Sequence, residues 1–185
     1  MKIEETSLKD CFIITDTVYS DDRGYFFESF NAERFCKLTG KYVTFVQDNQ
    51  SHSVRGVLRG LHFQKGEHAQ AKLVRVIRGE VLDVAVDLRK DSPTFGKYFS
   101  LVLSESSHTQ LFVPRGFGHG FIVLSEEADF FYKCDNFYNK ASEGGIKYND
   151  PDLNIDWKIP FAEILESEKD KQNISFAEFK KTINA

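Results

Sequence analysis

The chain has few of the features that mark secreted, membrane-bound or disulfide-stabilised proteins. Its three cysteines, Cys11, Cys36 and Cys134, are odd in number and widely spaced, which predicts neither a disulfide framework nor a zinc knuckle. No segment approaches the ~20 apolar residues of a membrane span. The acidic, polar start at Met1–Glu5 has no apolar signal core behind it. We therefore expect a cytoplasmic protein without a membrane partner.

An excess of basic residues is also missing. With 24 Lys and Arg against 28 Asp and Glu, the net charge is −4, and acids and bases are interspersed along the chain. Proteins that bind DNA or RNA displace phosphate counterions with a basic face, so a nucleic-acid polymer is not an expected partner. A mononucleotide is compatible with this charge, because its few phosphate charges need only one or two arginines.

Aromatic residues are what the chain has in plenty. It carries 18 Phe and 7 Tyr beside a single Met, and hydrophobic residues make up 41% of its 185 residues. This composition supports a packed core rather than disorder, and aromatic residues favour strands. The length predicts one domain that spans residues 1–185.

Short strand-like segments separated by turns dominate the chain. Lys41–Val46 is rich in β-branched and aromatic residues, which predicts a strand that opens into the polar run Gln47–Ser53. Leu73–Ile77 and Val81–Leu88 flank Arg78-Gly79-Glu80, which predicts a tight hairpin. Further strands are expected at Tyr98–Leu103, Gln110–Val113, Gly120–Leu124 and Asp129–Cys134.

Alternation within Val81–Leu88 predicts how that strand is buried. Asp83 and Asp87 fall on one face of the strand. The other face is apolar, and it consists of Leu82, Val84, Val86 and Leu88. This is the pattern of a half-buried strand with one polar face.

Helical patterns are confined to the two ends of the chain. Asn31 is the expected N-cap of a short helix at Ala32–Lys37 that ends near Gly40. Ser175 and Glu178 form a capping-box pattern before a helix at 176–183. Many short strands with few helices predict an antiparallel sandwich or barrel.

Two polar segments are ambiguous by themselves. Asp22–Phe30 combines an Arg, a Glu and three Phe, which a solvated edge strand with one core face explains without any function. Gln47–Ser51 has five successive side chains that can donate or accept hydrogen bonds. A plain surface loop is the simpler interpretation of that run.

A third segment, Arg59–Gln64, places His62 among apolar residues and near Lys72. A lone histidine in an apolar strand is more often a satisfied core residue than a catalyst. Buried cations, however, need an anionic partner, so the cluster favours an anion-binding pocket. Strict alternation puts Arg59 and His62 on opposite faces, and a bulge or bend near Gly60 is required for both to serve one pocket.

The segment Pro114–His119 reads Pro-x-Gly-x-x-His and resembles the second motif of the cupin barrels. Metal-dependent cupins usually supply His-x-His and a Glu from their first motif and one His from the second. Here the first motif reads His62-Phe63-Gln64, and Gln is a poor ligand for such ions. His62 and His119 alone are too few for a metal site, so we expect no metal and disfavour a metal-dependent oxygenase or isomerase.

Several segments, in sequence order and over nearly the whole chain, together resemble the dTDP-4-dehydrorhamnose 3,5-epimerase family. They are Asp22–Glu28, Gln47–Asn49, Arg59–Gln64, Glu80–Arg89, Gly116–Phe121, Phe131–Lys133, Ser142–Gly144 and Ser167–Asp170. The chain has Ala71 where the family pattern has a Gly, and the tail beyond Gln172 lies outside the match. The resemblance implies a mainly β, cupin-type jelly-roll barrel with short helices near the termini.

The resemblance also implies a reaction. The substrate would be dTDP-4-dehydro-6-deoxy-D-glucose, inverted at C3 and C5 to dTDP-4-dehydro-L-rhamnose in dTDP-L-rhamnose biosynthesis. The C4 ketone acidifies both neighbouring C–H bonds, so opposed acid and base groups and an enolate stabiliser suffice, and no cofactor is needed. The implied catalytic residues are the base His62, its orienting partner Asp170, the acid Tyr132 and the enolate stabiliser Lys72.

Residues that bind the nucleotide are implied in the same way. Arg23 and Arg59 would bind the diphosphate, and Tyr138 would stack on the base. The remaining implied substrate-binding residues are Phe26, Glu28, Gln47, Asp48, Asn49, His119, Glu143 and Lys169. The family also implies a homodimer that exchanges an N-terminal strand, so that some of these contacts come from the other subunit.

Two other functions are compatible with the same barrel. One is an epimerase that inverts only C3 or C5, or an isomerase that moves the keto group of a related nucleotide sugar. Tyr132 argues against incomplete epimerisation, because the loss of an acid opposite the base would favour it. The other is a non-catalytic sugar-binding cupin, which the complete set of His62, Asp170, Tyr132 and Lys72 makes less favoured.

Overall fold

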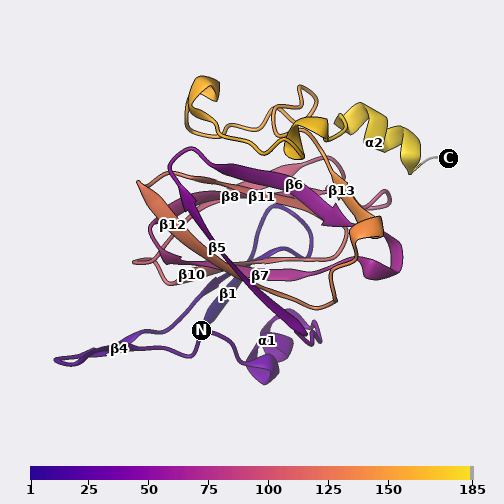
Figure 1. Ribbon diagram of the computed structural model, residues 1–185. Coiled ribbons are helices and arrows are strands. Elements are labelled where there is room, and N and C mark those ends of the chain that lie inside the picture. Colours follow the sequence, from indigo (N-terminus) through magenta and orange to yellow (C-terminus); the bar gives the residue numbers. More distant parts are fainter. Residues whose placement is uncertain (184–185) are drawn as a thin grey trace.

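Two antiparallel sheets packed face to face form a β-barrel in the computed structural model, which describes residues 1–183 (Figure 1). The strands are β1 (Lys2–Glu5), β2 (Phe12–Thr15), β3 (Tyr19–Asp21), β4 (Gly24–Phe26), β5 (Gln47–Val54), β6 (Leu58–Gln64), β7 (Lys72–Arg78), β8 (Glu80–Asp87), β9 (Tyr98–Ser104), β10 (Thr109–Val113), β11 (Phe117–Val123), β12 (Glu127–Cys134) and β13 (Glu143–Gly145). The six-stranded sheet has the order β1-β2-β10-β7-β12-β5, and the five-stranded sheet has the order β13-β6-β11-β8-β9. The expected mainly β, cupin-type barrel is confirmed.

Two helices lie outside the barrel, near the two ends of the chain, as the sequence predicted. They are α1 (Ala32–Thr39) and α2 (Phe176–Thr182). Asn31 caps α1 and the left-handed Gly40 ends it, while Ser175 and Glu178 form the complete capping box of α2. Four short 3₁₀ helices are η1 (Gly66–His68), η2 (Lys140–Ser142), η3 (Phe161–Glu163) and η4 (Asp170–Gln172). Neither α-helix within residues 1–183 has the length and apolar character that crossing a bilayer requires.

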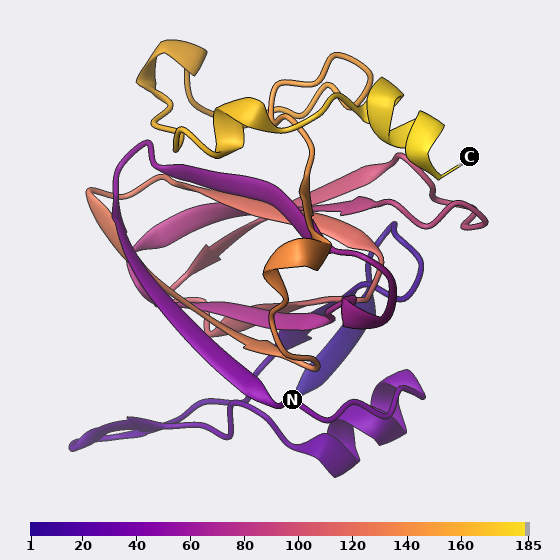
Figure 2. The same cartoon turned by 45° about the vertical axis from the view of Figure 1, so that its right-hand side comes forward.

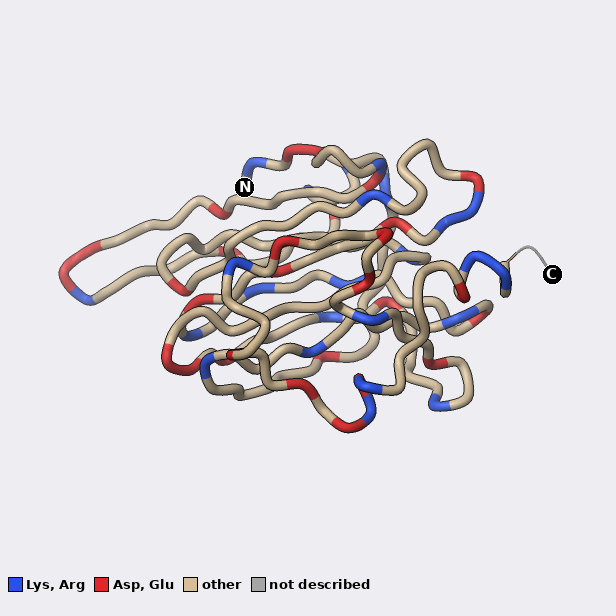
Figure 3. Tube along the Cα trace, turned by 90° about the horizontal axis from the view of Figure 1, so that it is seen from above, with Lys and Arg blue, Asp and Glu red and all other residues tan. Residues whose placement is uncertain are grey.

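Apolar side chains form three buried clusters, one inside the barrel and one on the outer face of each sheet. The interior cluster includes Val74, Phe117 and Phe130. The C-terminal segment covers the outer face of the five-stranded sheet around Trp157 (Figures 1 and 2), and α1 packs on the six-stranded sheet through Phe35. Lys and Arg alternate with Asp and Glu along the trace, without a face of one sign (Figure 3).

The hairpin predicted around Gly79 is wrong. Strands β7 and β8 do not pair with each other, because β7 lies between β10 and β12, and β8 lies between β11 and β9 in the other sheet. Gly79 carries the chain from one sheet to the other with a φ of +79°, and a Cβ there would lie 2.1 Å from the carbonyl oxygen of Glu127. The local turn pattern is real, but it does not determine which strands pair.

The strand predicted at Lys41–Val46 is also wrong, because the strand of this region begins directly after it. Residues 41–46 form neither helix nor strand, and the polar run that follows is strand β5. Its even-numbered side chains Asp48, Gln50 and His52 are exposed, while the odd-numbered ones turn inward. Polar residues form a strand here because β5 pairs along its whole length with β12.

The apolar face predicted for β8 exists, but the strand is not half-buried. Leu82, Val84 and Val86 pack under the C-terminal segment. Asp83 and Asp87, predicted to lie on a polar outer face, are both 0% exposed. The alternation was correct, and what it could not predict is that polar residues face the barrel interior here.

The charge of buried Asp87 is compensated by a cluster of hydrogen-bond donors at the end of β8. The Nε and Nη2 atoms of Arg89 donate to its two oxygens at 2.9 and 2.8 Å, and the hydroxyls of Ser92 and Thr94 also donate to it. Burial raises the pKa of the Asp87 carboxyl, but the hydrogen bonds from Arg89, Ser92 and Thr94 outweigh it, and the net pKa lies below its usual range. Asp87 is therefore a charged residue held inside the fold.

We predict that Arg89→Ala strongly destabilises the protein, because it leaves the Asp87 charge without its main partner. Removing one member of a buried pair costs about 3–5 kcal/mol, and we expect the lower end, since Ser92 and Thr94 remain. Urea unfolding measures the loss. The matched control is Arg78→Ala, whose exposed ion pair with Glu127 is worth below about 1 kcal/mol. Equal losses in the two variants would contradict a special role for Arg89.

Candidate active site

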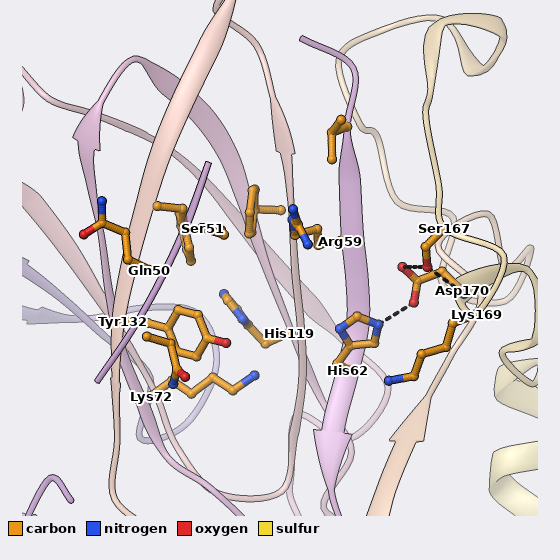
Figure 4. A pocket seen from close by; sticks show the side chains of 14 residues that line it. Gln50, Ser51, Arg59, His62, Lys72, His119, Tyr132, Ser167, Lys169 and Asp170 are labelled. Atoms are coloured by element: carbon orange, nitrogen blue, oxygen red, sulfur yellow. Dashed lines mark hydrogen bonds and ion pairs between the residues drawn. The ribbon is translucent and has the colours of Figure 1, made fainter. Parts of the chain in front are cut away.

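A cavity of about 490 Å³ lies between the two sheets, and polar groups from both sheets line it (Figure 4). The lining residues come from β5, β6, β7, β11 and β12, from the turn between β5 and β6, and from the segment that ends at the start of η4. They are Asn49, Gln50, Ser51, Val57, Arg59, His62, Lys72, His119, Phe121, Phe130, Tyr132, Ser167, Lys169 and Asp170. All four residues predicted as catalytic therefore border one space.

His62 and Asp170 form a dyad on one side of the cavity. Nε2 of His62 contacts Oδ1 of Asp170, and the other ring nitrogen, Nδ1, faces the cavity (Figure 4). Asp170 is 6% exposed, and the Ser167 hydroxyl donates to its second oxygen at 3.0 Å. Burial raises the pKa of Asp170, but the hydrogen bond and charge interaction with His62, together with the hydrogen bonds from Ser167 and Asn173, outweigh it, and the net pKa lies below its usual range. An ionised Asp170 fixes the proton on Nε2 and leaves Nδ1 as the basic atom.

The bulge required near Gly60 is present. Between His119 and Phe121 the register of β11 against β6 shifts, and Gly60 has a φ of +145°. A Cβ on Gly60 would lie 2.6 Å from the Cα of Gly120, so the two strands approach closely only because both residues are glycine. The irregularity lets Arg59 and His62 line the same cavity.

Tyr132 and Lys72 lie across the cavity from His62, on the six-stranded sheet (Figure 4). The Lys72 ammonium is 5.6 Å from the centre of the Tyr132 ring. Burial raises the pKa of the Tyr132 hydroxyl, which keeps the phenol protonated, and burial lowers the pKa of Lys72. A ligand in this cavity thus lies between an imidazole base and a phenol donor, with an ammonium group nearby.

A second His–Asp pair lies deeper in the barrel. His119, the register partner of His62 on β11, bonds through Nε2 to the two oxygens of Asp83 at 2.9 and 3.1 Å. Asp83 was missed as a site residue, because its alternation placed it on the assumed polar outer face of β8. The stacked rings of Phe121 and Phe130, 4.1 Å apart, form an apolar wall beside this pair.

An adjoining cavity of about 260 Å³ contains the other predicted nucleotide-binding residues of the barrel. Gln47, Tyr138 and Glu143 line it, and it shares Asn49, His62, Lys72 and Tyr132 with the larger cavity. The Tyr138 hydroxyl donates to Glu143 at 2.9 Å, and Lys169 donates to the other oxygen of that carboxylate. Glu143 therefore links the two cavities at their rim.

Four predicted substrate-binding residues lie outside both cavities. Arg23 and Phe26 belong to the β3–β4 hairpin, where Arg23 bonds to Asp21 and Phe26 is 71% exposed. Glu28 pairs with Arg34. Asp48 lies on the outer face of β5 and pairs with Lys133 at 3.0 Å, since its neighbours Gln47 and Asn49 are the residues that turn inward.

No set of three His, Cys, Asp or Glu side chains within residues 1–183 converges in a way that could hold a metal ion. Each histidine of the larger cavity instead bonds to one aspartate. The donor groups of the cavity are arranged as two separate hydrogen-bonded pairs rather than as one coordination sphere.

Comparison with known proteins identifies the family. The family model described as dTDP-4-dehydrorhamnose 3,5-epimerase matches residues 5–178. The protein of that name from Salmonella typhimurium is 52% identical over 166 residues, 90% of each chain.

Two solved structures agree with this family in fold and sequence. The structure of the epimerase from Elizabethkingia anophelis is 60% identical, with a TM-score of 0.94 and coverage of 96% of this chain and 97% of that one. A Legionella pneumophila epimerase in complex with dTDP-4-keto-L-rhamnose is 46% identical, with a TM-score of 0.90 and 96% coverage of both chains. The chain belongs to the dTDP-4-dehydrorhamnose 3,5-epimerase family.

Proposed function

We propose that this chain converts dTDP-4-dehydro-6-deoxy-D-glucose to dTDP-4-dehydro-L-rhamnose by inverting C3 and C5. One observation carries the proposal: the His62–Asp170 dyad and Tyr132 border one cavity from opposite sheets. The substrate assignment is supported by the Legionella relative, which binds dTDP-4-keto-L-rhamnose.

The chemistry needs only proton transfer beside the C4 ketone. In the proposed reaction, Nδ1 of His62 removes the proton from C3 or C5, and the electrons of that C–H bond move toward the C4 oxygen. Lys72 stabilises the resulting enolate, in a cavity whose low dielectric strengthens the interaction. The Tyr132 hydroxyl then returns a proton to the opposite face as the ketone re-forms. We propose no metal or nicotinamide in this scheme, because no electron leaves the substrate.

The nucleotide would extend from the larger cavity into the adjoining one. Arg59 is the proposed diphosphate ligand, with His119 and Lys169 as further substrate contacts. Gln47 and Asn49 would bind the thymidine, and Tyr138, half exposed at the rim, is the proposed stacking partner of the base. Glu143 would position Tyr138 through their hydrogen bond.

The remaining predicted contacts would come from a second subunit. We propose a cytoplasmic homodimer of single-domain subunits (residues 1–185) in which residues 17–28, the arm, reach into the partner's site. The arm projects away from its own barrel (Figures 1 and 2), which supports the proposal. Arg23, Phe26 and Glu28 would then contact the partner's ligand, and Asp48 would act only through its pairing with Lys133.

Incubation with dTDP-4-dehydro-6-deoxy-D-glucose in deuterated water tests the proposed reaction. We expect the parent protein to incorporate deuterium at both C3 and C5, with inversion at both, as followed by NMR. In Tyr132→Phe the base remains but the acid is gone, so exchange without inversion should dominate. Label at one carbon in the parent protein would instead favour a single-site epimerase, and no label would favour a sugar-binding barrel.

The base assignment predicts a separation of turnover from binding. His62→Ala should lower kcat by the ~10²–10⁴-fold typical of a lost general base, while the dissociation constant for dTDP changes little. Asp170→Asn should act in the same direction, because an amide can hold the wrong tautomer of His62. Steady-state kinetics and calorimetric titration measure the two effects. Retained turnover in His62→Ala, or binding lost in parallel with turnover, would refute the assignment.

Arm exchange predicts complementation between Arg23→Ala, which should bind the substrate weakly, and His62→Ala, which lacks the proposed base, when activity is measured at a substrate concentration far below KM. A heterodimer of Arg23→Ala and His62→Ala subunits has one intact site, formed by the arm of one subunit and the base of the other. Co-expression at equal levels gives half heterodimers, so about a quarter of the parent sites are complete. Activity near that level is expected, and the separately purified variants are the controls. If each arm serves its own barrel, mixing restores nothing.

A further inference from the structure

The arm makes few contacts along most of its length. Tyr25 and Phe26 are 63% and 71% exposed, and within residues 1–183 the Arg23 guanidinium pairs only with Asp21, two residues earlier. The arm stands away from the barrel in each of three views (Figures 1, 2 and 3). Its direction therefore depends on the way its two ends are fixed to the barrel.

One side chain holds both ends of the arm. Nε2 of Gln110 donates to Oδ2 of Asp16 at 2.6 Å and to the carbonyl oxygen of Ser29 at 2.6 Å. Asp16 immediately precedes the arm, and Ser29 immediately follows it. Both hydrogens of one amide group are thus used to hold together the two points where the chain leaves and re-enters the barrel.

Gln110 is well placed to act as a fixed anchor. It is 2% exposed, and it lies on β10 between two neighbouring strands, opposite Ile14 of β2 and Arg75 of β7. The ladder on both sides limits its movement. Its amide therefore transmits the position of the sheet to the root of the arm.

The surroundings of Asp16 favour a positioning role for its hydrogen bond with Gln110 rather than a purely stabilising one. It is 7% exposed, and its second oxygen, Oδ1, is buried without a hydrogen-bond partner within the described chain. A buried acceptor left unpaired costs about as much as a lost hydrogen bond, so this carboxylate is a poor choice for stability alone. It does provide a strong, directional acceptor for Gln110.

Other contacts near the root come from more exposed groups. The Met1 ammonium donates to the Thr17 hydroxyl at 2.8 Å, and Glu28 pairs with Arg34 at 3.2 Å. The Phe27 ring lies 4.9 Å from the His108 ring and 5.7 Å from the Arg75 guanidinium, and Tyr25 lies 4.8 Å from His108. A cavity of about 200 Å³ remains among these residues. Gln110 differs from these contacts in that one buried side chain bonds to both ends of the arm at once.

We infer that Gln110 is a positioning residue for the partner subunit's active site: it aims the arm so that Arg23 reaches the partner's diphosphate. This inference rests on the proposed exchange of arms. Gln110 would touch no substrate, and its effect would pass through Arg23. His62, Tyr132 and Lys72 stand on the barrel itself, so misaiming the arm should weaken binding far more than it slows the proton transfers.

A double-mutant cycle between Gln110 and Arg23 tests the inference, with dTDP as the probe in calorimetric titrations of the intact dimer. Gln110→Met keeps the length of the side chain and removes both donors. With Arg23 present, it should raise the dissociation constant for dTDP by about 5–10-fold. In the Arg23→Ala background, the same change should have a clearly smaller effect, below about 3-fold, because only Phe26 and Glu28 of the arm still contact the ligand. In steady-state kinetics, KM should rise and kcat should stay within about 2-fold of the parent.

Two controls separate positioning from general damage. Thr109→Val removes a neighbouring hydroxyl on β10 that bonds to Ser107 rather than to the arm, and it should leave dTDP binding unchanged. If Gln110→Met does not fold, Asp16→Ala enters the cycle in its place. It removes one of the two acceptors of Gln110 together with the unpaired oxygen Oδ1. Its effect on dTDP binding should therefore also be smaller in the Arg23→Ala background than with Arg23 present.

The outcomes distinguish two failures. If Arg23→Ala alone leaves dTDP binding unchanged, the arm does not serve a nucleotide site, and the proposed exchange and the inference both fall. If Arg23→Ala weakens binding but Gln110→Met changes nothing, or changes binding equally in both backgrounds, the arm serves the site and Gln110 does not position it.

Discussion

The burial of aspartate side chains within the fold is the constraint on which the rest of the structure depends. Five aspartates, Asp16, Asp83, Asp87, Asp150 and Asp170, are at most 7% exposed. A carboxylate removed from water must find donors or lose its charge. Asp87 finds its donors within the next seven residues, whereas each of the other four bonds to a distant segment of the chain. Those four aspartates therefore hold distant segments together.

The segments fixed in this way are those that build the site. Asp150 accepts the backbone N–H of Phe176 at 2.8 Å and so holds the start of α2 against the barrel. Asp170, in the segment just before that helix, accepts a hydrogen bond from His62. The C-terminal segment thus covers the five-stranded sheet through apolar packing, while its Asp170 carboxylate orients the proposed base. Packing and catalysis use the same layer of chain.

Sequence patterns predicted most strands and both helices well, but they predicted poorly which strands pair with each other. The caps of both helices and most strands follow from local chemistry, which the residues carry themselves. The pairing of β7 and β8 was wrong, since a Gly turn between two strands allows either a hairpin or a crossing between sheets. The polar β5 was missed for a related reason: its inward side chains Gln47, Asn49 and Ser51 face a cavity, and alternation assumes an apolar core.

The site, like the fold, could be predicted from the sequence only where the signal was local. The catalytic roles of His62, Tyr132, Lys72 and Asp170 were assigned only through a family resemblance, because nothing local in the sequence brings Asp170 near His62. The bulge at Gly60 could be deduced as a requirement, but its cause, the close approach to Gly120, is a tertiary contact. Asp83 had a usable signal, an acidic residue within an apolar strand. We interpreted that pattern as a solvent-facing side chain, whereas Asp83 is buried.

The charges of the two cavities also explain why one barrel would not suffice for a nucleotide diphosphate. Of the cations that line the larger cavity, Lys169 already bonds to Glu143, and Lys72 lies beside Tyr132 at the proposed reacting carbon. Arg59 bonds to Ser53 through Nε, which leaves its terminal nitrogens for a ligand. One guanidinium offers one bidentate contact, whereas a diphosphate carries two anionic groups. Under the proposed exchange of arms, the second guanidinium would be Arg23 of the other subunit, in keeping with an arm that extends away from its own barrel.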